Sequence, residues 1–97
     1  MSILKREMGF TRKELLSKLP AALHGYPYSI EGDVITIIPP ESAPNAICIT
    51  LGEAAVRKIA LLRLPYLHVD FDFTAVDDAA AKRFLTQFDL YTRKGGG

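Results

Sequence analysis

The chain has 97 residues, of which 48% are hydrophobic and 24% are charged, and its formal net charge is +1. This length supplies one modest core and excludes a second, so residues 1–97 are expected to form a single domain. The composition excludes an intrinsically disordered chain, and a charge this close to zero indicates no particular class of partner.

A single cysteine, Cys48, excludes an internal disulfide and a cysteine-based metal cluster. A lone thiol fits a reducing compartment. The first residues show no signal-peptide pattern, and no segment approaches the ~18 apolar residues that a membrane span requires. These features predict a cytoplasmic protein without a membrane partner and without a cofactor.

The first predicted element is a helix that begins after Thr11. Thr11 and Glu14 have the spacing of a capping box. An apolar stripe with helical spacing follows, made of Leu15, Leu16, Leu19 and Leu23. Pro20 lacks a backbone donor and clashes with the preceding turn, so the regular helix is expected to end or kink near Lys18. Residues 1–9, before the helix, are expected to be a flexible N-terminus.

Several strands are predicted next. Two β-rich runs, residues 26–30 and 34–38, are joined by Glu31-Gly32-Asp33, which predicts a hairpin. A third strand is expected over residues 46–51 and should end at Gly52. Residues 53–64 begin with alanines that favour a helix, yet they also alternate like a strand without a clean polar face. We expect a turn at 52–55 and a fourth strand from about Val56, and the helical alternative stays open.

The clearest strand covers residues 66–74, where apolar and polar side chains alternate after Pro65, which separates it from the preceding segment. One face carries Leu67, Val69, Phe71 and Phe73. The other carries His68, Asp70 and Asp72, a pattern typical of an antiparallel sheet with one face in water. The last helix is expected from about Asp77 to Thr92, with a buried stripe of Ala81, Phe84, Leu85, Phe88 and Tyr91.

These elements predict an α+β fold. We expect an antiparallel sheet of four or five strands, with an N-terminal and a C-terminal helix packed on one face. The predicted order of elements is a helix, several antiparallel strands and a second helix.

The chain ends in Arg93-Lys94 and three glycines, Gly95 to Gly97. This end resembles that of ubiquitin-like sulfur carriers, whose bare Gly-Gly lets an activating enzyme reach the terminal carboxylate. That resemblance would make Gly96 and Gly97 the working residues. It covers the tail alone, because the domains of those carriers begin with a strand hairpin. A helix C-cap at Gly95, with residues 95–97 as a flexible tail, accounts for the same residues and is favoured.

A second resemblance covers about the last third of the chain. The segment from Phe84 to Gly97 has the pattern F-L-x-x-F-D-x-Y-x-[RK]-G-G-G, and Leu64-Pro65 precedes an alternating strand. On these residues the chain is similar to a group of small uncharacterised bacterial proteins. The resemblance implies a shared fold and no activity.

His68, Asp70 and Asp72 are candidate metal ligands, because an imidazole and two carboxylates suit zinc or iron. Their spacing of two residues places them in a row on one strand face. A metal ion must be surrounded, so a ligand such as Cys48 or Thr50 from a neighbouring strand would be required. A solvated sheet face explains the same pattern and is favoured.

Ten of the twelve cations stand in five doublets: Lys5-Arg6, Arg12-Lys13, Arg57-Lys58, Lys82-Arg83 and Arg93-Lys94. Basic outer faces on the two helices would track phosphates. No aromatic platform accompanies these cations, so solubilising helix faces are favoured over nucleic-acid binding. No catalytic motif is recognisable. We therefore expect a small non-enzymatic accessory or interaction protein, which contacts another protein or itself through the exposed sheet face or an edge strand.

We predict that zinc does not bind tightly to His68, Asp70 and Asp72, because one strand cannot surround an ion. Calorimetric titration of the protein with zinc checks this expectation. Sub-micromolar binding that disappears in the His68→Ala variant would instead establish a metal site on this face.

Overall fold

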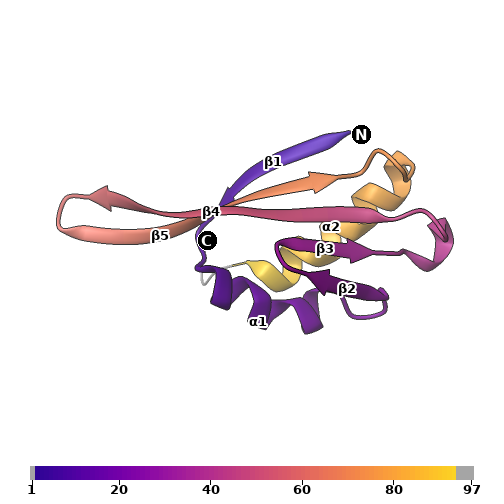
Figure 1. The fold of residues 1–97 in the computed structure, drawn as a ribbon, viewed down its shortest axis with the longest axis horizontal. Coiled ribbons are helices and arrows are strands. Elements are labelled where there is room, and N and C mark those ends of the chain that lie inside the picture. Colours follow the sequence, from indigo (N-terminus) through magenta and orange to yellow (C-terminus); the bar gives the residue numbers. More distant parts are fainter. Residues whose placement is uncertain (1, 94–97) are drawn as a thin grey trace.

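The computed structural model describes residues 2–93, which form a five-stranded antiparallel sheet and two α-helices (Figure 1). The strands are β1 (Ile3–Met8), β2 (Tyr28–Glu31), β3 (Val34–Ile37), β4 (Ile47–Ile59) and β5 (Leu62–Asp72). The helices are α1 (Arg12–Ala22), α2 (Asp78–Thr92) and a short 3-10 turn, η1 (Pro40–Ser42). The strand order is β1-β5-β4-β3-β2. The α+β class predicted from the sequence is confirmed, and none of the described helices is long and apolar enough to cross a membrane.

The core lies between the sheet and the helices. β5 contributes the buried side chains predicted from its alternation, and β4 contributes Ile47, Ile49 and Leu51. Aromatic contacts join β5 and the segment just after it to α2: the ring centroids of Phe71 and Phe88 are 5.2 Å apart, and those of Phe73 and Phe84 are 6.2 Å apart. α1 adds Leu15, Leu19 and Ala22. Both helices therefore bury their apolar residues in one common core.

The start of α1 is confirmed, whereas its predicted end is wrong. The Thr11 hydroxyl accepts a hydrogen bond from the Glu14 N–H, and the Glu14 carboxylate accepts one from the Thr11 N–H. These two bonds complete the capping box. The helix passes through Pro20 to Ala22, and the Leu23 N–H still donates to the Leu19 carbonyl at 2.8 Å. Proline removes only one helical bond close to the end of the helix, and burial of Leu19, Ala22 and Leu23 offsets that loss.

The prediction of a flexible N-terminus over residues 1–9 is wrong for residues 3–8. They form β1, which pairs with β5 from Ile3 opposite Asp72 to Met8 opposite Leu67. Arg6 hides the strand pattern because it lies on the inward face. Its guanidinium makes two hydrogen bonds to Asp89 of α2, one of them 3.1 Å long, and lies 5.4 Å from the centroid of the Phe71 ring. An ion pair and a cation–π contact thus occupy a position where the sequence pattern expects an apolar residue.

The β2–β3 hairpin is confirmed, and Gly32 in its turn has the positive φ of 57° that favours glycine. The predicted end of the third strand at Gly52, the turn at 52–55 and the break at Pro65 are wrong. β4 continues to Ile59 and β5 begins at Leu62, so that Pro65 lies within β5 opposite Val56. A β-bulge between Leu51 and Ala54 absorbs the irregularity.

Gly52 fits the bulge because a Cβ at this position would lie only 3.1 Å from the Cβ of His68.

The last helix agrees with the sequence prediction apart from one side chain. Asp77 caps it by accepting a hydrogen bond from the Ala80 N–H at 2.8 Å. Phe84 and Phe88 are fully buried, but Tyr91, predicted to be buried, is 48% exposed. Thr92 takes its place in the core because it follows Phe88 by four residues and so lies on the same side of the helix.

We predict that Phe88→Ala lowers the free energy of unfolding by about 3–5 kcal/mol, since it removes a ring packed on Phe71 and Phe84 and leaves a cavity. Denaturant unfolding measures this loss. Leu90→Ala is the matched control: Leu90 is in the same helix but 60% exposed, and its truncation should change stability by less than ~0.5 kcal/mol. Equal effects of the two substitutions would contradict the packing described above.

Candidate functional site

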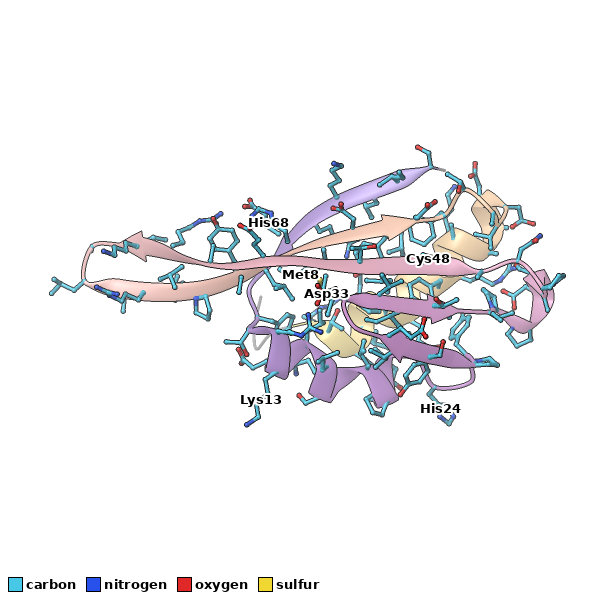
Figure 2. The ribbon with its side chains drawn as sticks, in the orientation of Figure 1. Met8, Lys13, His24, Asp33, Cys48 and His68 are labelled. Carbon is cyan, nitrogen blue, oxygen red and sulfur yellow. The ribbon has the colours of Figure 1, made fainter. Side chains whose placement is uncertain are left out.

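The metal candidates His68, Asp70 and Asp72 lie in a row along β5 on the sheet face turned away from the helices. As the sequence suggested, neighbouring β4 brings Thr50 opposite Asp70 and Cys48 opposite Asp72 (Figure 2 labels Cys48 and His68). Within residues 2–93, no three His, Cys, Asp or Glu side chains gather closely enough to hold a metal ion. The register therefore brings a second strand alongside the row without enclosing a coordination site.

Asp72, at the end of this row, is satisfied by local hydrogen bonds. Asp72 accepts hydrogen bonds from the backbone N–H of Thr74 at 2.9 Å and from its hydroxyl at 2.7 Å, and these bonds hold the pKa of Asp72 below its ordinary value. Lys5 lies opposite Asp70 in the β1–β5 ladder. An open depression runs over Lys5, Glu7, His68 and Asp70. It carries charged groups of both signs, so the face has the character of a solvated sheet surface.

The basic doublets do not form a continuous stripe. Lys5 and Arg6 point to opposite faces of β1, as the strand alternation requires. Ion pairs occupy one arginine in each of four doublets: Arg6 with Asp89, Arg12 with Asp33, Arg57 with Glu7, and Arg83 with Glu41. These pairs disperse the positive charge that a phosphate-tracking surface would concentrate.

The carrier candidates, Gly96 and Gly97, lie outside the described residues, as does Gly95. α2 ends at Thr92, and Arg93 has an extended backbone with φ of −63° and ψ of 125°.

The feature that sequence reasoning missed is a projecting hairpin. β3 accompanies β4 only as far as Thr50, and β1 accompanies β5 only from Leu67 onward. Between these points, residues 52–66 form a two-stranded ribbon, here called the arm, which extends beyond the helices (Figure 1). The arm is one reason why the molecule is 47 Å long but only 24 and 22 Å across.

The arm exposes aliphatic side chains that a soluble domain ordinarily buries. Leu61 at the turn is fully exposed, and the exposed fractions of four others lie between 45% and 61%: Val56, Ile59, Leu62 and Leu64. The arm also carries three of the cations, Arg57, Lys58 and Arg63. Residues 53–64 show a poor separation of polar and apolar faces, and this sequence pattern is the one expected of a ribbon with no buried side.

The two faces of the arm follow from its register. Val56 opposite Pro65 and Lys58 opposite Arg63 continue the core face of the sheet, while Arg57 belongs to the opposite face. At the base of the arm, the Arg57 guanidinium lies 4.8 Å from the centroid of the Tyr66 ring and 3.3 Å from a carboxylate oxygen of Glu7. These contacts fasten the base of the arm to β1 and leave its outer half exposed.

The arrangement offers a protruding apolar and basic ribbon beside a polar sheet face. No protein-family model, curated protein or solved structure matches the chain.

Proposed function

We propose that this chain is a non-enzymatic protein-interaction domain of the cytoplasm, and that the arm is its binding surface. The observation that carries the proposal is the exposure of five aliphatic side chains on one projecting ribbon: Val56, Ile59, Leu61, Leu62 and Leu64. Contiguous exposed apolar surface with polar neighbours is characteristic of protein-binding sites. Burying such side chains against a partner stabilises a complex by roughly 25 cal/mol for each Å² of apolar surface removed from water.

The stability of the ribbon supports the same proposal. A two-stranded hairpin is at best marginally stable in water when nothing covers it. Here the regular pairing of β4 with β5 continues through six residues on each side of the turn, from Ala54 opposite Leu67 to Ile59 opposite Leu62. A partner that covers one face or one edge would supply the third layer or strand that such a ribbon lacks.

The competing surfaces are less suited to binding a protein. The sheet face around His68 and Asp70 is polar, with charges of both signs in a shallow depression. The arginines of four basic doublets are engaged in ion pairs within the chain, which weakens the case for nucleic acid. The arm alone combines projection, aliphatic exposure and unpaired strand edges within residues 2–93.

In-cell photo-crosslinking tests the proposal. A photoreactive amino acid replaces Leu61 in one variant and Leu90 in the other, because Leu90 is an exposed apolar residue that belongs to α2 and not to the arm. We expect a discrete protein adduct from position 61 and none from position 90. Substituting Ile59, Leu62 and Leu64 by threonine should abolish the adduct while keeping the fold, since threonine retains strand propensity but removes apolar surface.

Two results would reject the arm as the binding surface: position 61 yields no protein adduct, or the adduct survives the three threonine substitutions in a protein with an unchanged melting temperature. Mass spectrometry of the adduct identifies whether the captured chain is a second copy or a different protein.

A further inference from the structure

We infer that the partner of the arm is a second copy of this chain, and that two arms pair antiparallel along β4 about a two-fold axis at Val56. The inference rests on the proposed function, because it names the occupant of the same surface. It is carried by three properties of residues 52–59: the direction of their backbone groups, the register that their side chains permit, and the charges at the two ends of the arm.

The exposed edge of β4 has its backbone groups directed outward at alternate residues. Ile59 and Leu62 flank a two-residue turn, and residues in this position form a hydrogen-bonded pair. Counting back from Ile59 by twos, Arg57 and Ala55 also face β5. Val56 then directs its N–H and C=O away from β5, which agrees with its position opposite Pro65, a residue without an N–H.

The other edge of the arm is less able to accept a strand. It belongs to β5 and contains Pro65, which cannot donate a hydrogen bond to a new neighbour. The edge of β4 contains no proline. The bond from the Leu51 N–H to the Asp33 carbonyl, 2.8 Å long, is the last contact of this edge with the β2–β3 hairpin, so within the described residues the edge is open from Gly52 onward. Strand addition is therefore expected at β4.

The side chains select the register. An axis at Arg57 would place two arginines directly opposite each other, which is unfavourable. An axis at Ala55 would place Ile59 of one copy beside Leu51 of the other, where Asp33 already lies. An axis at Val56 pairs Val56 with itself and sets each long cation opposite an alanine, with Lys58 opposite Ala54 and Arg57 opposite Ala55. It also makes Glu53 of one copy a diagonal neighbour of Arg57 of the other.

Charge complementarity favours the same arrangement. Near the tip of the arm, Lys58 and Arg63 lie directly opposite each other in the ladder, and such a like-charge pair is unfavourable in isolation. In the antiparallel dimer, the tip of each arm lies at the base of the other. That base is flanked by the β2–β3 turn, where Glu31 is exposed and Asp33 is paired with Arg12 of its own chain. The basic tip of one copy thus approaches the Glu31 carboxylate of the other.

Cysteine cross-linking tests the register, in a background where Cys48→Ser removes the native thiol. Directly opposite, hydrogen-bonded residues have Cα atoms ~5.5 Å apart, within the range of a disulfide. Val56→Cys should therefore form a disulfide-linked dimer under mild oxidation. Ala55→Cys is the matched control: its two copies would be staggered by two residues, with Cα atoms beyond the ~7 Å limit. Equal cross-linking of the two variants, or faster cross-linking of Ala55→Cys, would overturn the register.

A charge swap tests the dimer itself by analytical ultracentrifugation of the untagged chain. Arg57→Glu should raise the dimer dissociation constant about tenfold, because it sets Glu53 beside a second carboxylate in each half. Adding Glu53→Arg should restore dimerisation. Within one chain, residues 53 and 57 are ~13 Å apart along the strand, so a direct ion pair between these two positions can form only between copies.

A chain that stays monomeric at all concentrations, or a dimer that neither substitution affects, would overturn the second-copy inference. If the photo-crosslink from position 61 then captures a different protein, the proposed function stands and only this inference fails. If no protein is captured, both fail.

Discussion

The pairing of β4 with β5 is the constraint on which the rest of the molecule depends. One half of this ladder is the centre of the sheet, where Phe71 packs on Phe88 and the helices exclude water. The other half is the arm. Because both halves belong to the same two strands, the buried half fixes the direction and the register of the exposed half. A two-stranded ribbon that would be only marginally stable by itself in water is in this way kept folded by its continuity with the buried part of the sheet.

The bulge at Gly52 and the proline at position 65 mark the change from core strand to arm. The bulge increases the local twist of β4 where its partner β3 ends. Pro65 lies on the far strand, at a position where a missing N–H costs no bond within the hairpin. Between them, Arg57 bridges from the arm to Tyr66 and to Glu7 of β1, so the strand that sequence analysis treated as a flexible N-terminus braces the base of the arm.

How much could be predicted from the sequence depended on whether one side of an element faces water and the other faces the core. The alternation of residues 67–73 and the stripe through Phe84 and Phe88 have this contrast, and both were predicted correctly. β1 lacks the contrast because Arg6 points inward to Asp89 and Phe71. The predicted end of α1 near Lys18 was wrong for a different reason. Pro20 lacks one backbone donor, but burial of the neighbouring leucines outweighs the loss of that hydrogen bond.

The arm was not predicted from the sequence because neither of its faces packs against the core. Both faces and the edge of β4 are exposed, so side-chain periodicity reports neither a wet face nor a buried one. The order Ala54, Ala55, Val56, Arg57, Lys58 has no evident logic within one chain, since its alanines neither pack in the core nor extend a helix. In the proposed antiparallel dimer, the same order sets small residues opposite long ones and separates like charges. An unclear periodicity over residues 53–64 is therefore the pattern expected of a strand whose neighbour lies in another molecule.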